Sequence, residues 1–194
     1  MMIKRILIFL IVSVIFGSCT LIPSLNPLYK VKDIFFKESL LGTWASTEEK
    51  MNESWAFEKD KVVKNSYKLI HTKNGEKREL NAVLVKIGND IFIDIFINQL
   101  KLEFDNYLYR SHFFPVHTFS KIKIEKDEII IQMFDYEWMT KKIKEKQIEI
   151  DYIVSSDYSF LLTASTEDLQ KFVIKNKDNK EAFYDDLILK KNKF

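Results

Sequence analysis

The sequence predicts a mainly β protein with two short helices, whose antiparallel strands form a meander that closes into a barrel of about eight or nine strands. Three observations support this fold class. Apolar and polar residues alternate over short segments, turn signals such as Asn74-Gly75 separate those segments, and helical periodicity occurs in two places. Because a sheet of that many antiparallel strands tends to curl, closing into a barrel removes its edges.

The predicted strands share this alternation and are bounded by turns at Asn74-Gly75, Gly88-Asn89-Asp90 and Glu125-Lys126-Asp127. One strand differs, because Ile91–Ile97 is apolar on both faces, and this predicts that both of its faces are covered. The nine predicted strands are Leu41–Thr47, Ser54–Glu58, Val62–His71, Leu80–Ile87, Ile91–Ile97, Val116–Ile124, Glu128–Phe134, Tyr158–Thr163 and Leu187–Lys190.

Two segments have the periodicity of amphipathic helices. Asp135–Lys146 begins at an N-cap residue and ends among lysines, which favour the negative end of the helix dipole. Ser165–Lys175 also begins at an N-cap residue, and its apolar stripe consists of Leu169, Phe172 and Val173. We therefore expect two helices packed by one face each.

The N-terminus has the pattern of a secretory signal. Lys4 and Arg5 precede the apolar run Ile6–Phe16, which only Ser13 interrupts. A spanning helix needs about 20 apolar residues, whereas a run of about 7–15 is typical of a signal peptide. Two small residues then precede the chain's only cysteine, Cys19.

The segment Phe16-Gly17-Ser18-Cys19 resembles the lipobox of bacterial lipoproteins. The resemblance implies that the chain is cut before Cys19, that the Cys19 sulfur receives a diacylglycerol, and that the new amine is acylated. It also implies outer-membrane delivery, because Thr20 rather than Asp follows the cysteine. The alternatives are a plain signal peptide followed by a free thiol, and an uncleaved anchor.

The predicted organisation is a signal peptide over residues 1–18, a lipidated tether over 19–29 and a single β-barrel domain over 30–194. Pro23 and Pro27 are typical of a linker and favour the tether. Val31–Leu40 is expected to form a brief helical turn that covers one end of the fold. With Cys19 acylated, no thiol remains for a disulfide, so a packed core must hold the body together.

The charge balance argues against a broad anionic partner. The chain has 30 Lys and Arg residues against 28 Asp and Glu residues, and two of the basic residues, Lys4 and Arg5, lie in the leader. The body therefore carries no net formal charge. This balance argues against binding through a broad nucleic-acid or anionic-lipid surface, and no nucleic-acid partner is predicted.

A second resemblance involves the start of the body. Gly42-Thr43-Trp44 is similar to the Gly-x-Trp opening of lipocalin-like barrels, and the segments Leu161–Phe183 and Pro115–Phe119 resemble small uncharacterised bacterial lipoproteins. The lipocalin resemblance implies that Trp44 packs under the barrel floor. The basic partner on the last strand would be Lys190 or Lys191.

Four residues are candidates for ligand binding: Asp94, Arg110, His117 and Phe119. Asp94 lies in an otherwise apolar strand, so it is either a polar anchor in a cavity or a residue that faces water or is paired. Arg110 is a candidate partner for it. His117 shares a strand face with Phe119, with a hydrogen-bonded residue at a strand end as the alternative.

The aromatic stretch Phe104–Phe119 is either a lid over the barrel mouth or core filling. The sequence has no pattern of a catalytic nucleophile, a metal site or a phosphate loop, so no catalytic residue and no cofactor is predicted.

The function expected from these features is non-enzymatic. A lipoprotein is expected, held by membrane lipid through acylated Cys19 and binding a small apolar ligand inside the barrel. The alternative is a structural or protein-interaction module that docks an envelope protein. A third hypothesis, a hydrolase, depends on His117.

Overall fold

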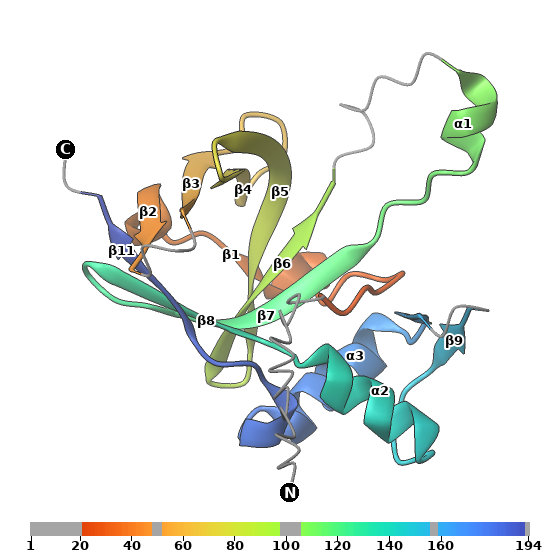
Figure 1. Cartoon of the computed structure of the whole chain (residues 1–194). Coiled ribbons are helices and arrows are strands. Elements are labelled where there is room, and N and C mark those ends of the chain that lie inside the picture. The colour runs from red at the N-terminus through yellow and green to blue at the C-terminus, as the bar shows by residue number, and fades with distance from the viewer. Residues whose placement is uncertain (1–20, 48–51, 98–105, 156–158, 193–194) are drawn as a thin grey trace, which may run out of the picture.

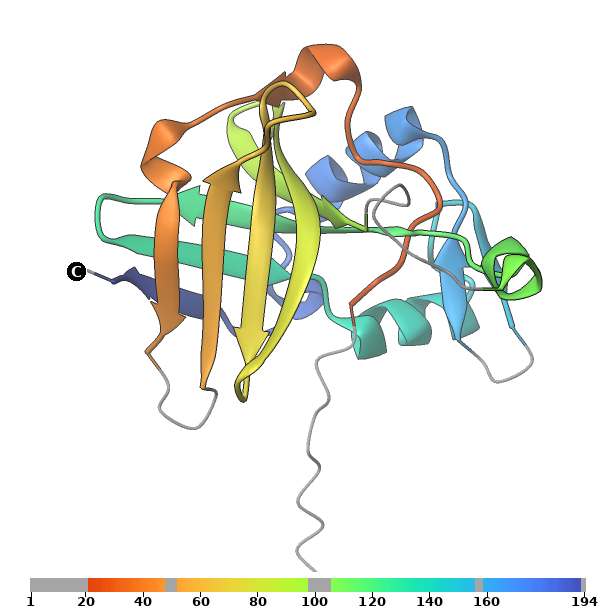
Figure 2. The same ribbon diagram turned by 90° about the horizontal axis from the view of Figure 1, so that it is seen from above.

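Eight antiparallel strands close into a barrel, as the sequence predicts (Figures 1 and 2). The computed structural model describes residues 21–47, 52–97, 106–155 and 159–192. The barrel strands follow the order β5-β4-β3-β2-β11-β8-β7-β6, and β6 pairs back onto β5. Their bounds are β2 (Gly42–Ser46), β3 (Glu53–Lys59), β4 (Ser66–Lys73), β5 (Glu76–Ile87), β6 (Asp90–Phe96), β7 (His117–Ile124), β8 (Glu128–Met133) and β11 (Leu187–Lys191).

Two strands close the barrel. β5 has 12 residues and pairs with β4 through its first part and with β6 from Asn81 onward. Past the end of β4, the short strand β1 (Ile34–Phe35) pairs with Leu84 and Val85 of β5. The other closure is β11, which lies between β2 and β8 and is antiparallel to both.

The β4–β5 turn has the geometry that its sequence predicts. Lys73 pairs with Glu76, so the loop consists of Asn74 and Gly75 alone. Both loop residues have positive φ, 52° and 83°. A two-residue hairpin loop with positive φ at both positions favours Asn-Gly, because these residues adopt that backbone with little strain.

Side chains from every barrel strand fill the interior. Trp44, Tyr67 and Phe57 are the largest fully buried ones, and each is at least 98% buried. Eight strands enclose a space about wide enough for side chains to fill. The buried interior residues are Leu40, Trp44, Trp55, Phe57, Tyr67, Leu69, Ala82, Leu84, Ile93, Ile122, Ile129, Ile131, Leu187 and Leu189.

Trp44 is fixed at one end of this interior. Its indole Nε1 donates to the carbonyl oxygen of Leu40 at 2.8 Å. Of the two lysines considered as its partner, Lys191 places its ammonium 4.8 Å from the ring centroid. Gly42 has φ of 115°, and a Cβ there would lie 3.3 Å from the Lys191 side chain. Glycine at position 42 therefore permits this close approach.

Two helices lie together on one side of the barrel, α2 (Tyr136–Lys144) and α3 (Thr166–Asn176) (Figures 1 and 2). Both predicted N-caps are present. Asp135 accepts hydrogen bonds from the backbone N–H groups of Glu137 and Trp138, and Ser165 accepts one from that of Asp168. Within the described ranges, no helix combines the length and the apolar character that crossing a membrane requires.

Short helical elements complete the fold. The segment expected to form one helical turn, Val31–Leu40, instead contains two 3-10 turns on either side of β1. These turns are η1 (Val31–Asp33) and η2 (Glu38–Leu40), and a further 3-10 turn, η4 (Lys180–Ala182), precedes β11. The helix α1 (Tyr107–Ser111) lies before β7.

A second core lies between the barrel wall and the helices. β6 contributes to both cores, because Ile93 points into the barrel and Phe92 points out of it, and both are fully buried. The prediction that both faces of this strand are covered is therefore confirmed. Opposite β6, Leu169, Phe172 and Val173 of α3 form the apolar stripe that the sequence predicts.

One predicted strand lies outside the barrel. Residues 160–162 form β10 (Phe160–Leu162), which pairs with β9 (Tyr152–Val154) in a separate two-stranded sheet. On its other side, Leu162 exchanges backbone hydrogen bonds with Pro23 and Leu25. The N-terminal segment therefore occupies the edge of β10.

The segment predicted as a tether differs from that expectation from Leu21 onward. Ile22, Ser24 and Leu28 are buried, so residues 22–28 belong to the packed body. The reason is that apolar residues alternate with the prolines and fit into the second core. Proline next to a strand edge is compatible with packing as well as with a linker.

Asp90 connects the barrel to the end of α3. Its carboxylate lies 2.9 Å from the Lys177 ammonium and 3.0 Å from that of Lys121. The hydrogen bond from Lys177, supported by that from Lys121, lowers the pKa of Asp90 below its ordinary value of 3.8.

We expect Asp90→Asn to lower the free energy of unfolding by about 1 kcal/mol or less at neutral pH. Because the folded pKa is the lower one, this contribution is complete above 3.8 and is lost as the pH falls through the folded pKa. Urea unfolding at several pH values measures it, with Asp185→Asn at an exposed position as control. A loss of stability that is equally large in acid would contradict the ion pairs as its cause.

Candidate functional site

The structure brings together two of the residues that the sequence selects, Asp94 and His117. They lie on the neighbouring strands β6 and β7, in a register that pairs Phe96 with His117. Asp94 Oδ1 is 2.7 Å from His117 Nδ1, and Asp94 Oδ2 accepts a hydrogen bond of 2.7 Å from the backbone N–H of Leu28. The Asp94 side chain is fully buried, and that of His117 is 17% exposed.

Aromatic rings surround the imidazole. The Phe96 ring lies 5.0 Å from the His117 ring between centroids, and the Tyr29 ring meets it edge-on at 6.1 Å. Burial raises the pKa of Asp94, while the hydrogen bonds from His117 and Leu28 oppose that rise. Burial, together with the nearby Asp94 charge, raises the pKa of Tyr29 to about 12. This is a desolvated site in which hydrogen bonds are strong.

The pair fastens the N-terminal segment to the barrel. Ser24 and His117 exchange two backbone hydrogen bonds of 2.8 Å, and Leu28 is held by Asp94. Both Asp94 oxygens are engaged, and no hydrogen bond joins His117 Nε2 to another residue in the described ranges. Asp94 and His117 therefore form a buried clamp on the outside of the barrel. Of the alternatives that the sequence leaves open for Asp94, the structure shows the paired residue and not an anchor inside a barrel cavity.

The other two candidates do not join this pair. Phe119 is buried in the second core, with its ring edge-on to that of Phe134 at 6.0 Å. Arg110 lies in α1, and its side chain is outside what the structure describes. Cys19 also lies outside the described residues.

The predicted aromatic lid is only partly described, because residues 98–105 lie outside the described ranges. Figure 1 shows α1 standing away from the barrel and from the other helices. Tyr107 and Phe114 are exposed, so these two rings do not fill the core, whereas Phe119 does.

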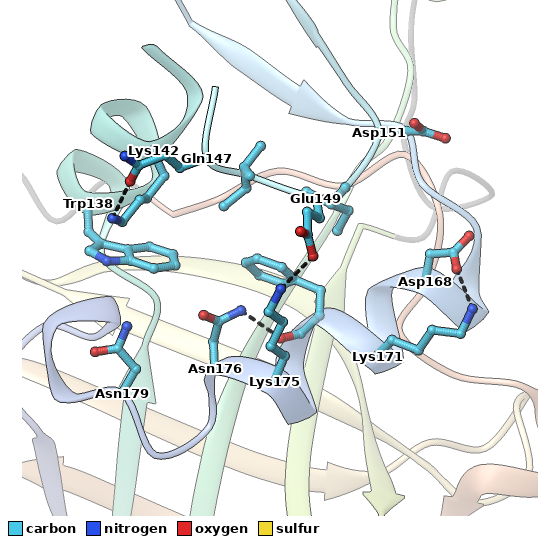
Figure 3. A pocket seen from close by; sticks show the side chains of 13 residues that line it. Trp138, Lys142, Gln147, Glu149, Asp151, Asp168, Lys171, Lys175, Asn176 and Asn179 are labelled. Carbon is cyan, nitrogen blue, oxygen red and sulfur yellow. Dashed lines mark hydrogen bonds and ion pairs between the residues drawn. The ribbon is translucent and has the colours of Figure 1, made fainter. Parts of the chain in front are cut away.

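A pocket that the sequence analysis missed lies between α2, α3 and residues 147–151 (Figure 3). Its volume is about 400 Å³. Apolar groups contribute to its lining together with polar ones, and the lining residues are Trp138, Lys142, Gln147, Ile148, Glu149, Ile150, Asp151, Asp168, Lys171, Phe172, Lys175, Asn176 and Asn179. We call this pocket the interhelical groove.

Polar pairs lie along the interhelical groove. Lys175 binds Glu149 at 2.5 Å, Lys171 binds Asp168 at 2.8 Å, and the Lys142 ammonium donates to Gln147 at 2.7 Å. The sequence signal was the polar face of α3. It was not recognised, because a polar helix face normally faces water and the position of residues 147–151 beside α3 depends on tertiary packing.

One buried polar atom of a residue that lines the groove lacks a partner. Trp138 Nε1 is buried from solvent and forms no hydrogen bond with the described residues. Leaving a buried donor unpaired costs about 1–3 kcal/mol. Within the described part of the chain, no group of three or more His, Cys, Asp or Glu residues is placed to hold a metal ion.

The fold and these sites define a closed eight-stranded antiparallel β-barrel with a helical layer packed on one side. Comparisons with protein families, with curated proteins and with solved structures found no match to the chain.

We expect Asp94→Asn to loosen the N-terminal segment. The amide oxygen carries no charge and is a weaker acceptor than a carboxylate oxygen, so the Leu28 amide proton should exchange faster with solvent than in the unchanged protein. Losing one buried hydrogen bond corresponds to about 1–3 kcal/mol.

Hydrogen exchange followed by NMR measures this change, with Leu69 in the barrel interior as internal reference and Asp185→Asn as control. Equal acceleration at Leu28 and Leu69 would indicate global destabilisation and would contradict the clamp.

Proposed function

We propose that the protein is a non-enzymatic binding module, held at the bacterial cell envelope by lipid on Cys19, and that it binds its partner on the outside of the barrel. The filled barrel interior carries this proposal. Trp44, Phe57 and Tyr67 occupy the space that a ligand inside an eight-stranded barrel would need.

Ring contacts support the filled interior. Phe36 stacks on Tyr67 with centroids 4.7 Å apart, and Phe57 meets Tyr67 edge-on at 6.1 Å. The Trp55 and Phe57 centroids are 6.2 Å apart. Rings in van der Waals contact leave little room for a guest, and well-packed cores resist expansion. This observation favours the interaction module over a small apolar ligand in the interior.

Binding on the outside is supported by the interhelical groove. It combines buried apolar side chains with paired charges and side-chain amides, a combination typical of small-molecule and partner sites. The buried clamp of Asp94 and His117 supports a positioning role for these residues, because their hydrogen bonds hold Leu28 and Ser24 in place.

The envelope location is supported by the lipobox-like Phe16-Gly17-Ser18-Cys19 behind a basic and then apolar leader. More than one acyl chain on a protein gives stable membrane attachment. With Thr20 after the cysteine, we place the protein in the outer membrane of a two-membrane cell.

We expect cells fed an alkyne-tagged fatty acid to label the protein, and Cys19→Ala to abolish the label, because Cys19 is the only thiol in the chain. In-gel fluorescence of the immunoprecipitated protein measures this, with Ser13→Ala as control inside the leader. Label that persists in Cys19→Ala would contradict the anchor.

We expect native mass spectrometry of the Cys19→Ala protein to give the mass of the polypeptide alone. The physical reason is that packed side chains leave no room for a retained lipid. A stoichiometric lipid that survives gentle desolvation and disappears on unfolding would contradict the filled interior.

A further inference from the structure

The interhelical groove has the dimensions of a small-molecule site. Sites for small molecules usually have volumes of about 300–1,000 Å³, and this one has about 400 Å³. Phe172 and Ile150, which are buried, contribute to its lining, and α2 and α3 form its sides (Figure 3).

The charges that line the groove cancel. Three lysines and three acidic residues contribute to it: Lys142, Lys171, Lys175, Glu149, Asp151 and Asp168. Two of these lysines are already paired with acids across or along the groove. A charged ligand would face a site without net charge and would have to compete with those pairs, so the site favours a neutral ligand.

The remaining side chains suit a ligand that has both hydroxyl groups and an apolar face. Three side-chain amides line the groove, and each makes one hydrogen bond within the protein: Gln147 Oε1 accepts from Lys142, Asn176 Nδ2 donates to the Phe172 carbonyl, and Asn179 Oδ1 accepts from the Glu181 N–H. An amide has two donors and an acceptor oxygen, so each keeps further hydrogen-bonding capacity for a ligand. In Figure 3 the Trp138 ring lies between the Lys142–Gln147 pair and the two asparagines. A sugar ring has C–H groups that pack on aromatic rings and hydroxyls that bond to amides at its rim.

Trp138 Nε1 adds a donor that lacks an acceptor. It is closed off from solvent, so a ligand reaches it when side chains around it shift. Lys142 is half-buried and Gln147 is exposed, and they join each other by a single exposed hydrogen bond, which makes such a shift feasible. A carbonyl or hydroxyl oxygen of the ligand would then satisfy the indole N–H.

We propose that the interhelical groove binds a neutral saccharide, with the Trp138 indole and the amides of Asn176 and Asn179 as its contacts. The proposal rests on the proposed function in taking the protein to be a binding module, and it names the chemical class of the ligand.

The test is NMR titration of the full, ¹⁵N-labelled protein in a detergent without a sugar headgroup. The probes are tri-N-acetylchitotriose and cellotriose, both neutral, and trigalacturonate, which is acidic. The chain has three tryptophans, and the indoles of Trp44 and Trp55 already donate to Leu40 and Glu53. A neutral trisaccharide is expected to shift the Trp138 indole signal downfield in a saturable way and to leave the other two unchanged, with trigalacturonate at least about tenfold weaker.

Two variants locate the contact. Asn176→Ala is expected to weaken binding about tenfold, since one hydrogen bond is lost, and Asn192→Ala on the end of β11 serves as the matched control with unchanged binding. Trp138→Phe keeps an aromatic ring but removes the N–H, and it should also weaken binding. If Asn176→Ala and Trp138→Phe bind the saccharide with the same affinity as the control Asn192→Ala, the interhelical groove is not the binding site.

Absence of any Trp138 shift at millimolar trisaccharide would overturn the saccharide proposal. If an envelope protein captured by a photo-crosslinker at Lys171 shifts Trp138 instead, the ligand class is wrong and the binding module stands. If a saccharide binds but fatty-acid labelling fails, the result supports the groove as a saccharide site and contradicts the proposed lipid anchor on Cys19.

Discussion

The structure depends on a barrel wall that is apolar on both of its faces. β5 and β6 place Leu84 and Ile93 inside the barrel and Val85 and Phe92 outside it, all fully buried. Burying a side chain of this size contributes about 1.5–3 kcal/mol, so the same two strands stabilise both cores. The helices, the N-terminal segment and the groove between α2 and α3 are all positioned by the outer of these two faces.

The sequence predicts what short-range patterns determine. Alternation locates the barrel strands, Asn74-Gly75 determines a two-residue hairpin, and Asp135 and Ser165 begin their helices as N-caps. The doubly apolar strand at Ile91–Ile97 even indicates that a second layer covers the barrel. These features depend on backbone sterics and on local hydrogen bonds, which the residues themselves specify.

The sequence does not predict which segments far apart in the chain pair with each other. The edge of β10 could be filled by the barrel or by residues 22–28, and alternation does not distinguish between these partners. Asp94 and His117 were both recognised as unusual, but their contact follows from the β6–β7 register, which places them on one face. The interhelical groove was missed because residues far apart in the chain form it, and its polar side chains have the pattern of an ordinary exposed helix.

The burial of Ile22 has a geometric consequence for a chain held by lipid at Cys19. Three residue steps separate these positions, and an extended chain covers at most about 3.3–3.6 Å per residue, so the body would begin within about 10 Å of a lipid-bearing Cys19. So short a connection would keep the barrel close to the bilayer. It would then reach only molecules that lie close to the membrane surface.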